Sequence, residues 1–589
     1  MATMRTSSLV HAALPRFDRA FFTGSEPFTR MGEGACGGKA SGLLRIKHVL
    51  DRVFPPAPSA PVTVVIPTLA VITTDLFDEF MTNNRLYPVA LGDATDDRIA
   101  HAFQQAQLPV ELLGDLRALV EQVHTPLAIR SSSLLEDALY QPFAGVYATK
   151  MIPNNQLDAD TRFRKLVEAV KYVYASTFSR SAKDYGRATG RDITEEKMAV
   201  IVQEVVGRRH GDRFYPDVAG VARSYSFYRS GVARPEDGVV NLALGLGKTI
   251  VDGGLAWTYS PPFPHATPPF ASARAMLNQT QATFWAVNMG KPPAYDPIAE
   301  TEYLVQAGLS DAAQDGTLDF VASTYDAQSD RMSIGARPLG AWAITFAPLL
   351  ALDDVPFNAV VKALLEACEE AVGAKVEIEF AMTIAPTPEG VRARFGFLQV
   401  RPMAVSDHVV EVPIEALESD AALVASEAVM GNGVIDTIRD IVYVKPDRFE
   451  AAHTRLIAQE LAQLNATLVD EKRPYLLIGF GRWGSSDPWL GVPVEWSQIN
   501  GAAAIVEATL PSMNVDLSQG SHFFHNLSSF QVSYFSVRHS GRYAIDFDWL
   551  ATQPVVAETD FVRWVRVAAP LLVKVDGRSG RGVVLNGQS

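Results

Sequence analysis

Residues 357–403 constrain the fold of this chain more than any other stretch. The segment FNAVVKALLEACEEAV (357–372) repeats apolar residues at helical spacing and predicts an amphipathic helix. Two further segments, 375–382 and 394–403, alternate polar and apolar residues on either side of the turn-like PTPEG, which predicts a β-hairpin. A helix that leads directly into a hairpin restricts the chain to folds that mix helices with sheets.

The same texture continues along much of the chain. Strand-like runs lie at 62–66, 126–130, 198–206 and 239–244, and helical patterns separate them. This alternation predicts an α/β or α+β protein. With 589 residues, of which 48% are apolar, the chain can bury large cores in two to four domains of roughly 150 residues each.

The pattern changes after Met403. The stretch AVSDHVVEVPIEALESD is typical of a connector, and a predicted helix at 448–468 then precedes a predicted strand at 475–480. We therefore place a domain boundary near residues 404–425. The predicted organisation is a first domain over 20–405, a connector over 406–440 and a smaller α/β domain over 441–589.

Charge and cysteine content exclude several classes of protein. The 66 acidic residues outnumber the 52 basic ones, and a net charge of −14 argues against a protein that coats nucleic acid. A local basic pocket for a nucleotide is still compatible with this charge. The two cysteines cannot form a disulfide framework. Because we find neither a bilayer-spanning apolar run nor a signal-peptide core, we expect a cytoplasmic protein with no membrane partner.

Two glycine-rich motifs do not meet the requirements of the nucleotide-binding loops that they superficially match. GEGACG (32–37) has the spacing of a dinucleotide-binding loop, but the sequence predicts no strand before it. LALGLGKT (242–249) ends like a P-loop, but Leu242 stands where the first glycine must be. We therefore expect neither a Rossmann nor a P-loop site.

Four other blocks carry chemistry, and the first is GGKASGL (37–43). Its paired glycines let the backbone approach a phosphate closely, and Lys39 adds positive charge. The same letters are also typical of a turn before a helix, so this alternative stays open.

The second block is LAIRSSSLLEDALYQPFAGVY (127–147). Arg130 ends a predicted strand and three serines follow it, so that a fork of guanidinium donors and several hydroxyls could cradle an anion. The alternative is an arginine that is satisfied by Glu136 or Asp137 of the same block.

The third block joins VIVQEVV (200–206), AGVARS (219–224) and ALGLGKTIVDG (243–253), and the fourth is the predicted hairpin. In the hairpin, Glu377 and Glu379 share one face, as do Gln399 and Arg401. Carboxylate and amide oxygens suit Mg²⁺, and a nearby arginine can neutralise a transferring phosphoryl group. The alternative for a Glu–Arg pair across a hairpin is a surface ion pair.

In this order and spacing, the blocks resemble the ATP-binding domain of the pyruvate phosphate dikinase and phosphoenolpyruvate synthase family. The similarity covers residues 20–405 and includes GGKASGL, IPTLAVITTDLFDEF, LAIRSSSLLEDALYQPFAGVY, VIVQEVV, GLGKTIVDGG and FLQVRPM. The resemblance implies an ATP-grasp-like nucleotide-binding domain of the α/β (α+β) class, with ATP and Mg²⁺ as cofactors.

The resemblance also implies roles for the matching positions. Lys39 and Arg130 would contact the phosphates of ATP, and Gln203 would lie against the adenine. Arg401 would stabilise the transferred phosphate as a catalytic residue, together with Arg130. Positioning and charge neutralisation by these side chains and the metal would supply most of the rate.

The remaining implied roles concern the metal and the glycine-rich turn. Glu379 and Gln399 would hold Mg²⁺. Gly245 and Gly247 stand in the family's glycine-rich, nucleotide-binding turn. Lys248 departs from the family, which often has Glu after Gly-Leu-Gly, so no role is transferred to that position.

The tail after residue 405 is too short for a TIM barrel of about 250 residues, so we expect no pyruvate barrel. It does resemble the family's swivelling phosphohistidine domain, which has an Ala-rich helix and an Ile-Val strand where this chain has 499–507. Ser521–His522 would be the Ser-His pair that carries the phosphoryl group, and 573–584 the closing strand-turn-strand. The extra ATLPSMNVDL before this pair and the Phe-Phe after it depart from that pattern. The alternative is that His522 and His525 are hydrogen-bonded structural histidines.

The sequence therefore predicts a dikinase-type phosphotransferase that moves a phosphoryl group from ATP to an unidentified acceptor. Transfer through His522 and direct transfer from ATP both stay open. A non-catalytic ATP sensor and a subunit that donates phosphate to a separate acceptor-binding protein are the alternatives. A partner protein or a homo-oligomer is compatible with each of them.

Overall fold

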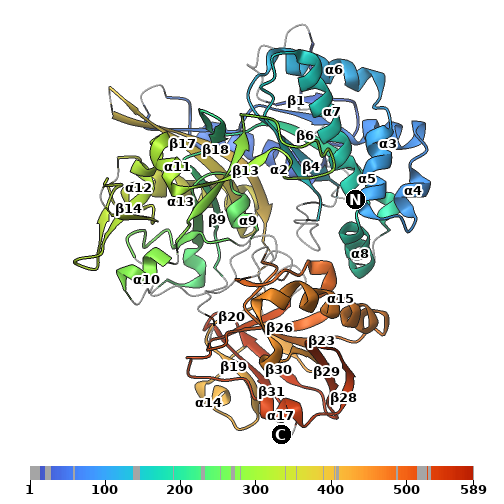
Figure 1. Cartoon of the computed structure of the whole chain (residues 1–589), viewed down its shortest axis with the longest axis vertical. Helices are drawn as coiled ribbons and strands as arrows, with labels where there is room; N and C mark the ends of the chain where they lie inside the picture. The colour runs from blue at the N-terminus through green and yellow to red at the C-terminus, as the bar shows by residue number, and fades with distance from the viewer. Residues whose placement is uncertain are drawn as a thin grey trace. The chain divides into compact units, whose positions relative to one another are not determined.

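The computed structural model describes most of the chain, and its described residues form two compact units (Figure 1). The first unit comprises Met1–Ser224, Val240–Thr249 and Leu255–Pro402, and the second comprises Tyr225–Val239, Ile250–Gly254 and Met403–Ser589. The described residues are 14–19, 28–57, 60–134, 136, 146–189, 192–226, 233–252, 254–266, 272–278, 280–338, 340–352, 354–388, 390–403, 405, 410–485, 489–511, 513, 527 and 532–587.

The first unit contains a five-stranded sheet in the order β1-β3-β6-β4-β5. Strand β1 runs parallel to β3, and the other neighbours are antiparallel. The strands are β1 (Phe28–Met31), β3 (Leu69–Ile72), β4 (Leu127–Ser133), β5 (Thr149–Ile152) and β6 (Met198–Glu204). The helices between them are α2 (Gly37–Val53), α3 (Thr74–Asn83), α4 (Tyr87–Leu91), α5 (Asp96–Gln105), α6 (Val110–Gln122), α7 (Ala159–Ser176) and α8 (Arg180–Thr189).

A six-stranded sheet in the order β11-β10-β9-β17-β18-β2 forms the other large layer of the first unit. Its central pair is the predicted hairpin, β17 (Val376–Thr387) and β18 (Gly390–Pro402), which is longer than the alternation indicated. The other strands are β2 (Val62–Val65), β9 (Val218–Arg223), β10 (Val239–Ala243) and β11 (Trp257–Tyr259). The predicted strands and the predicted hairpin in this unit are therefore confirmed.

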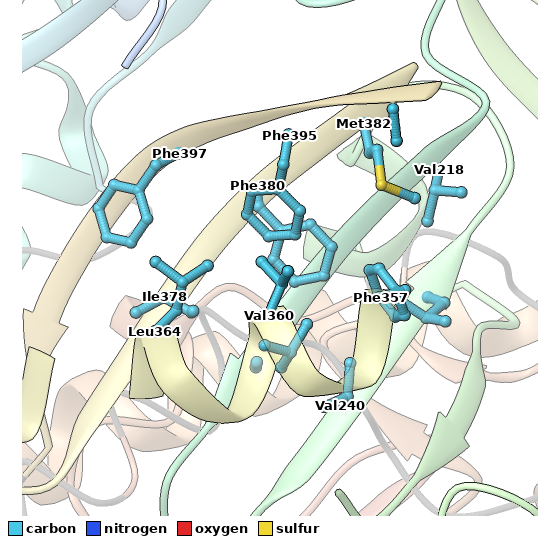
Figure 2. Close-up of a cluster of buried hydrophobic side chains, with 14 of the residues drawn as sticks. Val218, Val240, Phe357, Val360, Leu364, Ile378, Phe380, Met382, Phe395 and Phe397 are labelled. Atoms are coloured by element: carbon cyan, nitrogen blue, oxygen red, sulfur yellow. The ribbon is translucent and has the colours of Figure 1, made fainter. Parts of the chain in front are cut away.

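The helix that precedes the hairpin, α13 (Phe357–Val372), has the predicted bounds. It begins directly after Pro356 and ends at Gly373, whose φ of 73° lies in the left-handed region that terminates a helix. Figure 2 shows Phe357, Val360 and Leu364 of this helix clustered with side chains of the hairpin. One face of the hairpin is therefore committed to the hydrophobic core.

A β-bulge sets which hairpin side chains enter that core. Glu379 pairs with Gln399 but the next residue, Phe380, pairs with Phe397, so that Leu398 is an extra residue on β18. Because of this extra residue, Phe397 points into the core, while Gln399 lies on the opposite face. The aromatic rings of Phe380 and Phe395 stack with their centroids 4.6 Å apart (Figure 2).

Two smaller sheets complete the first unit, in the orders β13-β12-β8-β7 and β15-β14-β16. Their strands are β7 (Arg208–His210), β8 (Arg213–Tyr215), β12 (Thr283–Asn288), β13 (Leu304–Gly308), β14 (Ala322–Asp326), β15 (Arg331–Ile334) and β16 (Ala341–Ile344). The short helices nearby in sequence are α9 (Lys248–Val251), α10 (Ala273–Asn278), α11 (Leu309–Asp315) and α12 (Ala347–Ala351), with 3₁₀ turns η1 (Ile193–Glu195) and η3 (Leu318–Phe320). The 3₁₀ turn η2 (Pro235–Asp237) belongs to the second unit.

The second unit is a mixed α/β structure with a seven-stranded sheet, β20-β27-β26-β23-β22-β29-β28, and a four-stranded sheet, β19-β31-β30-β21. Strands β22, β23, β26 and β27 are parallel to one another. Residues of both sheets, among them Ile441, Val506 and Val573, share one core. The two sheets therefore pack against each other.

The elements of the second unit are as follows. Its strands are β19 (Ala422–Ser426), β20 (Val429–Met430), β21 (Gly433–Ile435), β22 (Asp440–Val444), β23 (Tyr475–Phe480), β24 (Arg482–Trp483), β25 (Gly491–Val492), β26 (Ala502–Ala508), β27 (Ser533–Val537), β28 (Val555–Glu558), β29 (Val562–Arg566), β30 (Leu572–Asp576) and β31 (Arg581–Leu585). Its helices and 3₁₀ turns are α14 (Ile414–Leu417), α15 (Thr454–Asp470), α17 (Phe547–Ala551), η4 (Pro446–Arg448), η5 (Ala451–His453) and η6 (Trp496–Gln498).

Two expectations for this unit are corrected. The helix predicted from residue 448 begins at Thr454, because the preceding residues form the separate 3₁₀ turns η4 and η5. The Ala-rich helix implied by the resemblance is not formed: the alanines belong to strand β26, which is held between the parallel strands β23 and β27. Small side chains suit such a central strand because both of its faces are covered.

None of the helices in the described ranges combines the length and the apolar character that a bilayer crossing requires.

The packing at Phe380 gives a first test of the fold. Replacing Phe380 with alanine should lower the free energy of unfolding of the first unit by about 3–5 kcal/mol, because the ring is buried and stacked. Urea unfolding measures this loss. The matched control is Val110→Ala, at an apolar side chain that is 83% exposed and should contribute little. Equal, small losses in the two variants would contradict the packing described here.

Candidate functional site

A row of charged side chains crosses the face of the six-stranded sheet that points away from α13. Glu377 lies directly opposite Arg401 across the hairpin, and Arg223 of β9 lies opposite Glu377 on its other side. Glu379 lies opposite Gln399 one step further along. The period-two alternation of the sequence therefore places these side chains on one face, as predicted.

The row is held by short ion pairs. Arg401 Nε lies 2.8 Å from Glu377 Oε1, and Arg401 Nη2 lies 2.5 Å from Glu379 Oε1. Arg223 Nε donates to Glu377 Oε2 at 2.5 Å. Glu377 and Arg401 are each only 1% exposed, so the surface ion pair considered for this hairpin is excluded.

Arg130 joins the five-stranded sheet to this row. From β4, its Nη2 lies 3.2 Å from Glu379 Oε2 and donates to Gln399 Oε1 at 2.8 Å. Its Nη1 donates to the carbonyl oxygen of Leu398 at 2.9 Å, at the bulge that interrupts the regular ladder. Gln203 of β6 also accepts from Nη1, at 3.4 Å. Four residues distant from Arg130 in sequence thus meet at its guanidinium.

Lys39 forms a separate pair close to the end of β4. Its Nζ lies 2.9 Å from Glu136 Oε1 and donates to Ser131 Oγ at 3.2 Å. The other carboxylate oxygen of Glu136 accepts from the backbone N–H of Ser133 at 2.9 Å. Glu136 therefore neutralises Lys39 and not Arg130, which corrects the alternative partner considered for Arg130; Asp137 lies outside the described residues.

The glycines before Lys39 are required by the protein's own backbone. A Cβ atom on Gly37 would lie 1.6 Å from the carbonyl oxygen of Ser132, and one on Gly38 would lie 1.8 Å from that of Glu136. Gly37 also has a φ of +76°. The start of α2 therefore packs directly on the chain after β4, which explains the glycines without a phosphate.

The second glycine-rich turn follows β10. Gly245 has a φ of +81°, and a Cβ atom there would lie 2.7 Å from the carbonyl oxygen of Trp285. A Cβ atom on Gly247 would contact Ala219 of β9, at 3.7 Å. No contact described here joins either glycine to the charged row. Gly247 is therefore near the start of β9, and Arg223 is the last residue of that strand.

The structure corrects the view that no strand precedes GEGACG, because β1 ends at Met31 directly before it. A dinucleotide-binding loop is nevertheless not formed, since the strand after α2 is β2, which belongs to the other sheet. The backbone N–H groups of Glu33 and Gly34 each donate to the Asp75 carboxylate at 2.8 Å. A side chain of the protein thus fills the place that a phosphate would need.

Burial and hydrogen bonding act oppositely on the pKa of Asp75. Burial alone would raise it, but hydrogen bonds from Thr73 and from the backbone N–H groups of Glu33, Gly34 and Leu76 together hold the pKa below its ordinary value. Asp75 is therefore a charged structural anchor for this loop.

Glu196 is a buried carboxyl group near Glu136. Its Oε1 accepts from the backbone N–H of Leu134 at 3.2 Å. Burial, and in second place the negative charge of Glu136, raise the pKa of Glu196 to about 7, although hydrogen bonds from Ser133 and from backbone groups oppose the rise. The proton on Glu196 is therefore retained into the neutral range.

The chemistry of Glu379 and Gln399 fits Mg²⁺. Both supply hard oxygen atoms, and they face each other across the hairpin. Arg130 Nη2 already bridges the two side chains as a cation. Within the described part of the chain, no group of three or more His, Cys, Asp or Glu side chains is arranged to hold a metal ion. Water and the phosphates of a bound nucleotide would therefore supply the remaining ligands of a magnesium ion, as is usual.

Of the predicted site residues, the structure brings together Arg130, Gln203, Glu379, Gln399 and Arg401. Lys39 contacts Ser131, the residue that follows Arg130. Ser521, His522 and His525 lie outside the described residues. The sequence predicted no binding or catalytic role for Arg223, Glu377 or Glu136, which complete the ion pairs; Glu136 was expected only as a possible partner of Arg130. Period-two spacing of Glu377 with Glu379 was a signal for one of them.

The chain was compared with protein-family models. The model for the pyruvate phosphate dikinase AMP/ATP-binding domain matches residues 33–421 of the chain. The match contains the charged row, Arg130 and Lys39.

The raised pKa of Glu196 predicts a pH-dependent stability. Because the folded protein holds this proton more tightly than the unfolded chain, stability should fall as pH rises from about 4.5 to about 7. Glu196→Gln should remove this part of the loss, so the variant should gain on the parent between about pH 5 and about pH 8. Urea unfolding at both pH values measures the gain. Glu204→Gln is the control, and an equal pH dependence in parent and Glu196→Gln would contradict the prediction.

Proposed function

Because the chain belongs to the family of the pyruvate phosphate dikinase AMP/ATP-binding domain, we propose that it is an ATP-dependent phosphotransferase of the dikinase type. ATP would bind at the junction of the two larger sheets of the first unit, in an ATP-grasp-like arrangement. The observation that carries the proposal is Arg130, which reaches from one sheet to Glu379, Gln399 and the Leu398 carbonyl of the other. A guanidinium at such a junction is suited to phosphate.

Arg130 and Lys39 would bind phosphate by exchanging partners. Each is paired with a carboxylate in the ligand-free protein, Arg130 with Glu379 and Lys39 with Glu136. A phosphate oxygen can replace a carboxylate oxygen as the acceptor of these charge-assisted hydrogen bonds. Gln203, next to Arg130, would line the nucleotide. The family resemblance also gives Gly245 and Gly247 to the nucleotide-binding turn, although no contact among the described residues joins them to the charged row.

Glu379 and Gln399 would hold Mg²⁺ once Arg130 has turned to the phosphates. The ion, when bound, would neutralise charge on the phosphates of ATP. Arg401 is already held on the other side of Glu379, through its Nη2. It would remain there and stabilise the negative charge that spreads over the transferred group.

The route of the phosphoryl group is also proposed, and its acceptor is unidentified. Transfer would proceed through His522 of the second unit or directly from ATP, and His525 would be structural. We propose a cytoplasmic protein whose partners are ATP, an acceptor and, as alternatives, a separate acceptor-binding protein or a second copy of the chain.

Labelled ATP tests the proposal most directly. The full chain is incubated with ATP labelled at the β- or the γ-phosphate, and nucleotides and protein are analysed. Net conversion to AMP and phosphate supports a dikinase, and conversion to ADP alone supports a simple kinase. Binding of ATP without any turnover would contradict the phosphotransferase and favour an ATP sensor.

Substitutions in the charged row give the next prediction. Glu379→Gln should weaken Mg²⁺-dependent nucleotide binding, because the amide binds a cation less strongly than a carboxylate. Arg401→Ala should lower turnover by about 100-fold while weakening ATP binding much less, because its charge acts on the transition state. Steady-state kinetics and calorimetric titration with ATP at several Mg²⁺ concentrations measure the two effects.

Glu204→Gln is the control for these variants, since it makes the same carboxylate-to-amide change elsewhere in the first unit. Glu204 accepts a hydrogen bond from Thr125 and no contact of the charged row. Glu379→Gln and Arg401→Ala proteins that consume ATP like the parent, while remaining folded, would show that the site is misplaced.

The relay gives a separate prediction for the second unit. After ATP treatment, mass spectrometry under neutral conditions should find a phosphoryl group on His522, which is lost in acid and survives in base. His522→Ala should abolish the label and His525→Ala should retain it. Labelling should fall as pH drops through the histidine range, because the neutral ring nitrogen is the nucleophile. Full labelling of His522→Ala would leave direct transfer as the mechanism.

A further inference from the structure

We propose that Arg223 is a positioning residue, which acts through Glu377 to fix the guanidinium of Arg401. Neither Arg223 nor Glu377 has a role in the phosphotransfer described above. The inference rests on that proposed function only in the task it gives to Arg401. It concerns the coupling among Arg223, Glu377 and Arg401, which can be measured with or without turnover.

The backbone places the three side chains in one line. Arg223, Glu377 and Arg401 are register partners on the adjacent strands β9, β17 and β18. Side chains directly opposite one another on neighbouring strands lie close together on the same face. The order of charges is therefore fixed by strand pairing, with the carboxylate between the two guanidinium groups.

Glu377 divides its two oxygens between the two arginines. Oε2 accepts from Arg223 Nε at 2.5 Å, and Oε1 lies 2.8 Å from Arg401 Nε. The carboxylate is 1% exposed, so water cannot replace either arginine readily. With Arg223 in place, Arg401 meets only one oxygen of Glu377, and its Nη2 is directed to Glu379 at 2.5 Å.

Loss of Arg223 would change this division. Glu377 would then have one buried oxygen without its arginine, and the nearest cation is Arg401. A guanidinium prefers to bind both oxygens of one carboxylate with two parallel N–H groups. Arg401 would turn towards Glu377 and withdraw Nη2 from Glu379, which is where the proposed reaction needs it.

Arg223 also differs from an arginine that serves stability alone. Among the described residues, its buried Nη2 atom has no hydrogen-bond partner. Arg208 likewise has a buried nitrogen, Nε, with no partner among these residues, but its Nη2 donates to both oxygens of the buried Asp217, at 2.9 and 3.0 Å, and the backbone N–H of Ile384 completes that site. Arg223 instead donates to one oxygen of Glu377 and leaves the other to Arg401. Arg208 is therefore a matched control.

The experiment compares Arg223→Met, Arg223→Lys and Glu377→Gln in the full chain. Arg223→Met should lower kcat for ATP consumption about tenfold or more and change KM for ATP less than about threefold, since the transition state is affected. Arg223→Lys, which keeps the charge but can contact only one oxygen, should restore part of kcat. Arg208→Met should leave kcat and KM at the parent values.

Double variants test whether the effect passes through Glu377. The protein that combines Arg223→Met with Glu377→Gln should have the kcat of Glu377→Gln alone, within about a factor of two. Multiplication of the two single effects would overturn the proposal, and so would a parent-like kcat in Arg223→Met.

Urea unfolding provides a readout that needs no turnover. The losses caused by Arg223→Met and Arg401→Met should depart from additivity in the parent and add in the Glu377→Gln background, because the shared carboxylate couples them. Simple additivity in both backgrounds would overturn the positioning role. A parent protein that consumes no ATP would instead contradict the proposed function, and the unfolding cycle would then decide the role of Arg223 by itself.

Discussion

The buried ion pairs of the hairpin β17–β18 are the constraint on which the rest of the first unit depends. Burying a carboxylate such as Glu377 is unfavourable unless its oxygens meet cations and donors. Strand pairing supplies those partners from two sides, because Arg223 and Arg401 flank Glu377 on neighbouring strands. Arg130 then brings the five-stranded sheet to the same place through Glu379. The two sheets are thus joined by charge and not only by apolar contact.

The hairpin itself was largely predictable from the sequence. Period-two alternation gave the shared face of Glu377 and Glu379 and that of Gln399 and Arg401, and helical periodicity gave α13 to the residue. A closer reading of FGFLQVR could also have given the bulge. Phe395 and Phe397 are two residues apart, as strict alternation requires, but the next apolar residue of the core, Val400, follows three residues after Phe397. One extra residue must therefore lie between them, and it is Leu398.

The partners of individual side chains were not predictable. Arg130 and Glu379 are 249 positions apart, and nothing in the local pattern of either strand names the other. The same holds for Asp75, which fills the glycine loop 41 positions before it. A glycine-rich loop has the same letters whether a phosphate or a protein carboxylate occupies it. Only tertiary structure distinguishes the two, and here it shows a carboxylate.

The balance of charges at the site links the binding of the proposed ligands to one another. The charged row and Arg130 together contain three cations and two carboxylates, namely Arg223, Arg401, Arg130, Glu377 and Glu379. Lys39 and Glu136 balance each other. When phosphates recruit Arg130, the carboxylate of Glu379 and the amide oxygen of Gln399 lose the guanidinium that they share. A buried carboxylate without its cation is strongly unfavourable, and these are the hard oxygens that Mg²⁺ prefers. A divalent cation would take the place that Arg130 leaves beside Glu379, and the phosphates would take the place that Glu379 leaves beside Arg130. Binding of a phosphate ligand and binding of a divalent cation should therefore favour each other.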